Sequence, residues 1–412
     1  MTFINKYNLP NPVCMYKWTW STIRLMEGTT NSCHRVDGDS ITPENYENFH
    51  NTPSKLKQRK KMLDGQWPGE GCEYCRDLEH AGAESDRLEL NLHTHLAPPE
   101  LEKDPKAINL TPRMVEVYFN NLCNLGCIYC GAEYSTVWET ENKKFGDTHT
   151  AFGMPIERLA ESRKQYPKML EAHWKWLEKN AHEIHSYNVL GGEPFFQPEL
   201  EQNIDFFETT PAPNLEFSVF SNLKVPNKKL RRILDKLTSL KERNHIRSMH
   251  IVCSLDCWGP QQEYIRSGLN LKNWEQNFLT ILREYPNISL SIHGTLINLT
   301  MQTLPDLCYK ITKWKKIRNF RHSIGFGLGH PEFDAGIFPK GFFDKEFDKA
   351  INTTADEEMK SWIDGFRKRV DATPYSYEKI KKLKNRLDHL DKRRQTNWRE
   401  LWPWLDKYED DS

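Results

Sequence analysis

Ten cysteines are the residues of this 412-residue sequence best suited to chemistry, and seven of them lie in its first third. These seven form a group of four and a later group of three, namely Cys14, Cys33, Cys72 and Cys75, then Cys123, Cys127 and Cys130. Cysteine thiolates are soft ligands that bind zinc or iron–sulfur clusters. The opening residues lack the charged-then-apolar layout of a secretory signal, so we interpret both groups as metal sites rather than as a disulfide framework.

The second group has the spacing C-x3-C-x2-C and follows a short apolar segment directly. Three closely spaced thiolates can bind three irons of a four-iron cluster and leave the fourth iron open to another ligand. A structural zinc ion would require a fourth protein ligand, and the nearest downstream histidine is His149. The spacing therefore favours a cluster with an open iron.

The rest of the sequence must position these cysteines. Six segments rich in Val, Ile and Phe are bounded by Gly, Pro or Asn, as is typical of strands, and they span residues 114–119, 184–190, 215–220, 250–255, 288–297 and 322–328. Helical patterns lie between them, and alternating strands and helices predict a parallel sheet with right-handed crossovers. Six units are too few for the usual eight-unit barrel, so we expect an α/β fold with a partial (β/α)6 barrel.

Three domains are expected from the change of character along the chain. Residues 1–110 lack a regular strand–helix alternation and end in a proline-rich segment, residues 111–340 hold the alternation, and residues 341–412 form a charged helical extension. Residues 131–155 are too many for an ordinary connection, which indicates a functional loop or lid. We expect Trp398, Trp402 and Trp404 to dock the extension onto the body and its basic residues to form a solvated helix face.

Composition excludes several classes of protein. Lys plus Arg and Asp plus Glu both number 57, so the formal net charge is zero and nucleic acid is not an expected partner. Hydrophobic residues make up 38% of the chain, which is enough for a core and excludes wholesale disorder. No apolar run approaches the roughly 18 residues of a membrane span. We therefore expect a cytoplasmic protein with no membrane partner.

The cysteine spacing, with Tyr129 before its last cysteine, resembles the signature of the radical S-adenosylmethionine (SAM) superfamily. A second motif agrees with it, because a GGEP sequence at the end of the second expected strand is similar to that superfamily's motif. It consists of Gly191, Gly192, Glu193 and Pro194. The segments 221–223 and 254–256 resemble family motifs at the next two strand ends. The resemblance covers about residues 112–330.

This resemblance implies roles for particular residues. Cys123, Cys127 and Cys130 would hold a [4Fe-4S] cluster whose open iron binds SAM, and Glu193 would accept the methionyl amino group. The two glycines before Glu193 would let the backbone approach closely. The tyrosine would pack on the adenine, with core packing as the alternative. Two further residues would contact the ribose or carboxylate of SAM, namely Asn222 and Ser254, although Ser254 also fits an ordinary strand-end hydroxyl.

The N-terminal cysteines resemble the auxiliary-cluster region of SPASM/Twitch radical SAM proteins. Four cysteines match a single extra [4Fe-4S] cluster, which is the Twitch number. The chain departs from that pattern in two ways, because the region precedes the barrel and the cysteines of the longer SPASM pattern are missing after residue 130. A structural zinc site is the alternative, since four thiolates also make a closed tetrahedral site.

The expected function is therefore reductive cleavage of SAM, followed by abstraction of a hydrogen atom from a substrate by the 5′-deoxyadenosyl radical. A peptide or protein is the expected substrate, and a small-molecule dehydrogenase or cyclase is the alternative enzyme. A reductant such as flavodoxin or ferredoxin would supply the electron. A zinc-binding or electron-transfer interaction protein is the alternative outside enzymes, but it leaves the GGEP motif unexplained.

Asp256 and three other cysteines have simpler interpretations. Asp256 follows the fourth expected strand, where it could contact SAM or substrate or could cap a loop. Cys253 and Cys257 are too far apart along an extended strand, about 13 Å, to share one metal ion. We expect these two and Cys308 to pack in the core, with a position facing the active site as the alternative for Cys257, which lies past the strand end.

Overall fold

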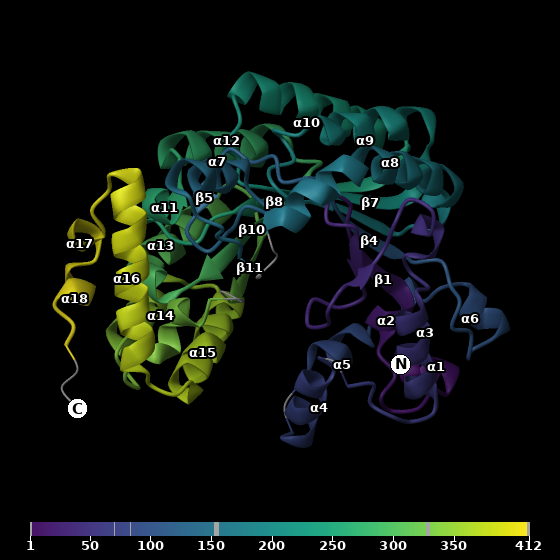
Figure 1. Cartoon of the computed structure of the whole chain (residues 1–412), viewed down its shortest axis with the longest axis horizontal. Coiled ribbons are helices and arrows are strands. Elements are labelled where there is room, and N and C mark those ends of the chain that lie inside the picture. The colour runs from purple at the N-terminus through teal and green to yellow at the C-terminus, as the bar shows by residue number, and fades with distance from the viewer. Residues whose placement is uncertain (1, 70, 83, 152–155, 327–329, 410–412) are drawn as a thin grey trace. The chain divides into compact units, whose positions relative to one another are not determined.

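The computed structural model describes residues 2–69, 71–82, 84–151, 156–326 and 330–409 (Figure 1). Contacts between residues divide the chain into two compact units. The first unit comprises Met1–Asn121, Glu157–Val219 and Asp235–His250, and the second comprises Leu122–Ile156, Phe220–Leu234 and Ile251–Ser412. Strands β7 (Ala212–Ser221) and β8 (Ile246–Ser254) and helix α10 (Asn227–Glu242) contribute residues to both units.

The first unit contains a mostly parallel run of strands in the order β3-β2-β1-β4-β6-β7. Their bounds are β1 Trp20–Arg24, β2 Thr29–Asn31, β3 Asp39–Ser40, β4 Met114–Tyr118 and β6 Ser186–Leu190. Strand β4 pairs in parallel with β1 and β6, so that Glu116 lies between Thr22 and Asn188. Strands β2 and β3 extend the edge in antiparallel fashion.

Strand β1 was not among the expected strands, the first of which began at residue 114. Its sequence, WSTIR, carries the buried polar residues Ser21 and Thr22 in place of an apolar alternation. Thr22 Oγ1 donates a hydrogen bond to Glu116 Oε2 at 2.8 Å, which satisfies both polar groups in the interior. Because strand prediction relies on apolar periodicity, this polar strand gave no signal.

Helices surround these strands. In the first unit they are α1 Phe3–Tyr7, α2 Met15–Thr19, α3 Pro53–Leu63, α4 Glu73–His80, α5 Asp86–Leu90, α6 Glu100–Lys103, α8 Ile156–Asn180 and α9 Pro198–Thr209, with 3-10 turns at Tyr46–Asn48, Thr94–Leu96 and Ala181–Glu183. Helix α2 packs against α3 and α5. Helix α3 begins where Thr52 Oγ1 accepts a hydrogen bond from Lys55 N and Pro53 occupies the first turn.

The second unit contains strands in the order β8-β10-β11 and a separate two-stranded ladder. Strand β10 (Ser289–Leu296) pairs in parallel with β11 (Arg321–Phe326), and β5 (Gly126–Cys127) pairs antiparallel with β9 (Arg266–Ser267). The helices are α7 Thr136–Phe145, α11 Pro260–Ile265, α12 Leu271–Glu284, α13 Leu304–Lys315, α14 Asp344–Thr353, α15 Glu357–Ala372, α16 Tyr377–Arg394, α17 Trp398–Leu401 and α18 Pro403–Asp406, with 3-10 turns at Asn298–Thr303, Pro331–Phe333 and Ala335–Ile337.

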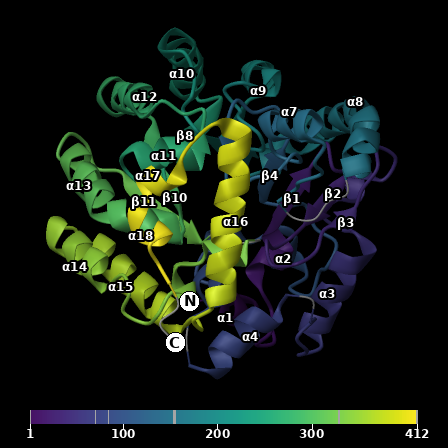
Figure 2. The ribbon, with the colours of Figure 1, turned by 60° about the vertical axis from the view of Figure 1, so that its left-hand side comes forward.

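The C-terminal extension is helical, as expected, and α17 folds back against α16 (Figure 2). Trp398 and Trp402 are fully buried, and Trp402 Nε1 donates a hydrogen bond to Leu299 O at 2.8 Å. Trp402 therefore docks the extension as expected, whereas the hydrogen bonds of Trp398 reach Asp388 and Asp391 of the extension itself. Trp404 packs edge-on against Phe338.

All six expected strands are present, as β4, β6, β7, β8, β10 and β11. The last of them extended in our prediction to residue 328, and residues 327 and 328 lie outside the described ranges. The expected loop or lid at residues 131–155 contains α7, and its residues 152–155 also lie outside those ranges. The fold is thus mixed α/β with a parallel sheet, while the partial barrel and the three-domain division remain predictions. No helix in the described ranges combines the length and the apolar composition that a bilayer crossing requires.

Candidate functional site

The three-cysteine loop in the second unit is held first by the start of α7. Thr136 Oγ1 accepts a hydrogen bond from Cys123 N at 3.3 Å and donates one to Cys123 O at 2.9 Å. Trp138 Nε1 donates to Cys127 O at 2.8 Å. Ser135, the N-cap of α7, also donates from Oγ to Leu125 O at 2.6 Å. The first turn of the helix after the loop therefore holds the backbone at two of its cysteines.

The β5–β9 ladder fixes the middle of the same loop. Cys127 lies opposite Arg266, and Ile128 N donates a hydrogen bond to Ile265 O at 2.9 Å. This pairing brings the Arg266 backbone to the loop, although Arg266 lies 138 positions after Ile128 in the sequence. The cysteine backbone is thus hydrogen-bonded from two directions.

The thiols of the loop are shielded from water. Cys123 and Cys127 are buried, and Cys130 is partly buried. Burial raises the pKa of Cys130 well above its ordinary value, and the neighbouring charges of Cys127 and Cys123 raise it further. Within the described residues, no group of three or more His, Cys, Asp or Glu side chains is arranged to hold one metal ion. The thiolates of a four-iron cluster, by contrast, each bind a different iron.

Tyr129 is tied to a buried acid. Its hydroxyl donates a hydrogen bond to Asp256 Oδ2 at 2.7 Å, and Asp256 is completely buried. Arg266 donates to the same carboxylate from Nε at 2.7 Å and from Nη2 at 2.8 Å, and Thr295 N donates to Oδ1 at 2.8 Å. Burial raises the pKa of Tyr129 well above its ordinary value, so the phenol stays protonated and able to donate.

Asp256 therefore joins the cysteine loop, β9 and β10. Our sequence analysis left open a contact with SAM and a loop-capping role, and it missed Arg266 entirely. Gly294 is the residue of the sequence that could have pointed to this site. A Cβ added there would lie only 2.5 Å from Leu255 O. Strand β10 can approach the end of β8 this closely because residue 294 has no side chain.

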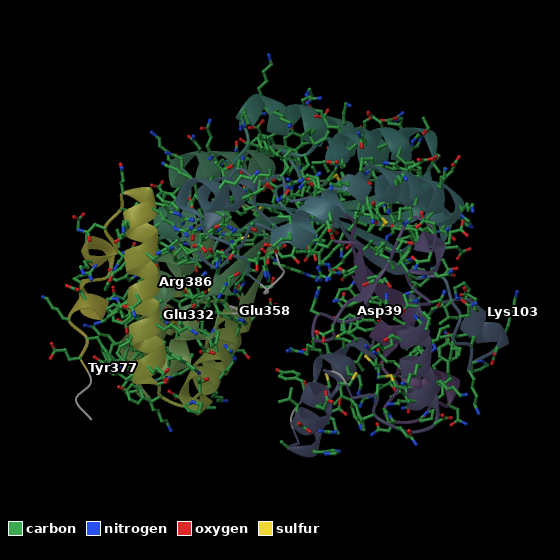
Figure 3. The ribbon with its side chains drawn as sticks, viewed as in Figure 1. Asp39, Lys103, Glu332, Glu358, Tyr377 and Arg386 are labelled. Carbon is green, nitrogen blue, oxygen red and sulfur yellow. The ribbon has the colours of Figure 1, made fainter. Side chains whose placement is uncertain are left out.

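Arg386 of α16 also contacts the cysteine loop, and our sequence analysis did not identify it. Its Nη2 donates a hydrogen bond to Ile128 O at 3.0 Å, and its Nη1 donates to Glu332 Oε1 at 3.1 Å (Figure 3). Both partners of this ion pair are largely buried. Helix α16 thus binds the cysteine loop through the Arg386 guanidinium, and the Glu332 carboxylate balances its charge.

Two histidines, His149 and His330, also lie next to the Arg386 guanidinium. His149 Nε2 lies 3.0 Å from Cys130 O and 3.3 Å from an Arg386 nitrogen, and His330 Nδ1 lies 3.3 Å from the same guanidinium. Burial lowers the pKa of both imidazoles to about 4, and the Arg386 charge lowers it further. Both are therefore neutral at pH 7. His149, the histidine considered as a zinc ligand, contacts the Cys130 backbone through Nε2.

Two more arginines of α16 correct the expectation of a solvated basic face. Arg393 is buried and pairs with Asp147, and Arg394 Nε donates to Glu141 Oε1 at 3.1 Å. The Arg394 guanidinium also lies 4.8 Å from the ring centroid of Trp138. These basic residues contact α7 and the loop that follows it.

Of the two further SAM-contact candidates, Asn222 lies at the cysteine loop. Its Nδ2 is 3.9 Å from Cys123 Sγ and donates a hydrogen bond to Asn124 Oδ1 at 3.1 Å. Ser254 is the last residue of β8 and is partly buried. Cys253, Cys257 and Cys308 are buried, which confirms the expected core packing.

The GGEP motif lies in the first unit, directly after β6. Gly191 has a φ of +99°, and an added Cβ would lie 3.2 Å from Asn120 O. Gly192 N donates a hydrogen bond to that same oxygen at 3.1 Å. Glu193 is 1% exposed, and its Oε1 accepts a hydrogen bond from Phe195 N at 3.0 Å. Gly191 therefore lets the end of β6 approach Asn120 closely, and the roles of the glycines and of Glu193 toward SAM remain predictions.

The four N-terminal cysteines all belong to the first unit, and we call them the N-terminal cysteine cluster. Cys14 is the N-cap of α2, Cys72 is the N-cap of α4, Cys75 lies within α4, and Cys33 follows β2. Burial raises the pKa of Cys14 to about 12 and of Cys72 to about 11. The charge of Cys33 raises both values further and acts on Cys75 as well. Charge effects thus link Cys33 to the other three thiols, but in the described residues the four side chains are not arranged to hold one metal ion.

Known proteins offer distant similarities. No protein-family model matches this chain. No curated protein matches its sequence. The structure of SuiB from Streptococcus suis bound to S-adenosylmethionine has a TM-score of 0.37 and 14% identity, over 76% of this chain and 63% of the SuiB chain. A structure of TYW1 with a lysine–pyruvate adduct bound has a TM-score of 0.29 and 19% identity, over 56% of this chain and 68% of that chain. The match spans less than two thirds of the SuiB chain, and TM-scores below 0.5 do not establish a common fold.

Proposed function

We propose that this chain is a radical SAM enzyme, which cleaves SAM reductively and takes a hydrogen atom from its substrate. The observation that carries the proposal is the loop of Cys123, Cys127 and Cys130, whose buried thiols sit on a backbone hydrogen-bonded by α7 and β9. Cysteines that only pack in a core act as small apolar residues and need no fixed spacing, so the C-x3-C-x2-C spacing is better explained by shared ligation of a cluster. The GGEP sequence at a strand end supports the same proposal.

The residues present fit a [4Fe-4S] cluster with one open iron, because the loop offers three thiolate ligands. When bound, such a cluster binds the amino and carboxylate groups of SAM and supplies the electron that cleaves the S–C5′ bond. Glu193 would accept hydrogen bonds from the methionyl ammonium. Asp256 holds the Tyr129 hydroxyl and so orients the ring proposed to pack on adenine. A flavodoxin or ferredoxin would provide the electron.

The N-terminal cysteine cluster would hold a second centre. By ligand number, four thiols fit an auxiliary [4Fe-4S] cluster and a closed zinc site equally. We propose the iron–sulfur cluster, because the loop of the second unit already requires cluster assembly. The SPASM/Twitch-like arrangement of cysteines supports a peptide or protein as substrate.

SAM cleavage tests the proposal directly. Anaerobically reconstituted protein given dithionite and SAM should produce 5′-deoxyadenosine without any added substrate. Cys127→Ala should abolish the product, because two remaining thiolates anchor the cluster poorly. Cys308→Ala is the matched control, since it removes another buried thiol, from α13, and should leave product formation unchanged. Equal product from the Cys127→Ala variant and the wild type would exclude a radical SAM enzyme.

A further inference from the structure

Glu199 of helix α9 is a buried acid to which the proposed function gives no role. It lies six residues after Glu193, in the first turn of the helix that follows the GGEP sequence, and it is 4% exposed. In the described residues its Oε2 atom has no hydrogen-bond partner. A buried carboxylate with one unpaired oxygen is costly, so Glu199 contributes little if its role is only to stabilise the fold.

The hydrogen bonds that the described residues donate to this carboxylate reach its other oxygen, Oε1. The Tyr166 hydroxyl of α8 donates to it at 2.7 Å, and Asn120 Nδ2 donates to it at 3.0 Å. Asn120 Nδ2 also lies 3.3 Å from the hydroxyl oxygen of Tyr166. Burial raises the pKa of Tyr166 above its ordinary value, and the Glu199 charge raises it further, so the phenol stays protonated and able to donate. The three side chains therefore join the end of β4 to two helices.

Asn120 connects these side chains to the GGEP sequence. Its carbonyl oxygen accepts a hydrogen bond from Gly192 N at 3.1 Å and another from Gln197 Nε2 at 3.0 Å. These two residues lie on either side of Glu193 in the sequence, and all of them belong to the first unit. One carbonyl thus holds both ends of the turn that carries Glu193, and Glu199 holds the side chain of the residue to which this carbonyl belongs.

We propose that Glu199 is a positioning residue of the SAM site, which fixes the GGEP turn through Asn120 and so orients the Glu193 carboxylate. This inference rests on the proposed function, in which Glu193 accepts hydrogen bonds from the methionyl ammonium. Hydrogen bonds weaken steeply when their angle departs from linearity, so a small rotation of the turn reduces the binding of that ammonium. Glu199 acts through another residue and does not itself touch SAM.

The test uses the full, anaerobically reconstituted chain. Glu199→Ala removes the shared acceptor of Asn120 and Tyr166. Glu199→Gln keeps that acceptor, and its amide nitrogen replaces the oxygen that has no partner. Asn120→Ala removes the connecting side chain and leaves the backbone carbonyl in place. Phe207→Leu is the matched control, because Phe207 is fully buried on the same helix but packs against Phe217 of β7.

Two measurements are made on every variant, namely SAM affinity by equilibrium dialysis with labelled SAM and stability by urea unfolding. Glu199→Ala and Asn120→Ala should each weaken SAM binding about tenfold, since a displacement of about 1 Å by a remote substitution can cost up to about a hundredfold. The double variant should bind no more weakly than the weaker single variant, because both changes break the same connection. Glu199→Gln should keep wild-type affinity. Phe207→Leu should lose stability and keep wild-type affinity.

The rate of SAM cleavage gives a further readout that a loss of stability would not produce. In Glu199→Ala the KM for SAM should rise, while the rate of 5′-deoxyadenosine formation at saturating SAM should stay close to that of the wild type. This split is expected because the ammonium contact exists before and during cleavage and so contributes binding alone.

Several results would overturn the inference. Wild-type affinity in a folded Glu199→Ala protein would do so, while SAM binding by the wild type would leave the proposed function standing. Glu199→Gln binding as weakly as Glu199→Ala would show that the negative charge acts on SAM directly. An equal loss of affinity in Phe207→Leu would reduce the role of Glu199 to stability. If Glu199→Ala does not fold, Asn120→Ala decides by the same criterion. A wild-type chain that binds no SAM would overturn the proposed function and the inference together.

Discussion

The hydroxyl of Tyr129 donates a hydrogen bond to the buried carboxylate of Asp256 at 2.7 Å. The same carboxylate receives both hydrogen bonds of an Arg266 fork, which is the strong, bidentate form of an ion pair. A residue inside the C-x3-C-x2-C loop is thereby fixed to the end of β8 by an interaction that is entirely within the second unit. The position of the Tyr129 ring therefore depends on an acid and a base that lie far from it in sequence.

Asp256→Ala should destabilise the protein by about 3–5 kcal/mol, because it leaves the Arg266 guanidinium buried without its counter-charge. Asp256→Asn keeps an acceptor and should cost less. The measurement is urea unfolding followed by near-UV circular dichroism. Asp364→Ala is the control on exposed α15 surface, where a change within about 0.5 kcal/mol is expected. Equal stability of the Asp256→Ala and Asp364→Ala variants would contradict the ion-pair argument.

Tyr129→Phe and Tyr129→Ala separate the ring from its hydroxyl. If the ring packs on adenine, Phe should keep SAM affinity close to that of the wild type, and Ala should weaken it about two- to tenfold. Equilibrium dialysis of the reconstituted protein with labelled SAM measures both. A loss with Phe as large as that with Ala would show that the hydroxyl carries the effect.

Glu193→Ala should weaken SAM binding about ten- to a hundredfold, because a charge-assisted hydrogen bond to the methionyl ammonium would be lost. The absorbance of the cluster should stay unchanged, since Glu193 is not a thiolate ligand. Glu193→Gln is the informative control, because its amide oxygen can still accept from Phe195 N while the charge is gone. Wild-type affinity in Glu193→Gln would mean that the carboxylate charge has no role in binding SAM.

Arg386→Met should lower both the iron content and the melting temperature. It removes the hydrogen bond to Ile128 O in the cysteine loop and leaves Glu332 buried and uncompensated, at a cost of about 3–5 kcal/mol. The double variant Arg386→Met/Glu332→Gln should recover part of the stability but not the loop contact. Arg367→Met is the control, because its pairs with Asp344 and Asp348 are exposed and should be worth less than about 1 kcal/mol. Wild-type iron content in Arg386→Met would rule out this role of α16.

Glu116 should make stability depend on pH. Burial raises its pKa to about 7, and the hydrogen bond from Thr22 lowers it only partly. Because the folded pKa lies above the unfolded one, the contribution is fully present below about pH 4.5 and is lost as the pH rises through 7. Glu116→Gln should therefore reduce the loss of stability between pH 5 and pH 8 by about 2 kcal/mol. Exposed Glu178→Gln should change that difference little, and an equal effect of the two variants would contradict the assignment.

The sequence by itself determined the elements whose signals are local. Strands and helices differ in the period of their apolar residues, so β4, β6, β7, β8, β10 and β11 could be found from periodicity. Ligand spacing is local too, and for this reason the three-cysteine loop and the GGEP motif could be placed at strand ends. Strand β1 was not predicted, because the buried polar residues Ser21 and Thr22 interrupt its apolar pattern.

Only the tertiary structure decided which distant groups meet. Arg386 reaches Ile128 across 258 residues of sequence, and Tyr129 reaches Asp256 across 127. The physical reason is common to both, because the energy of a buried charge depends on its partners and its distance from water. Both are set by the path of the folded chain, and residue type and spacing do not contain them.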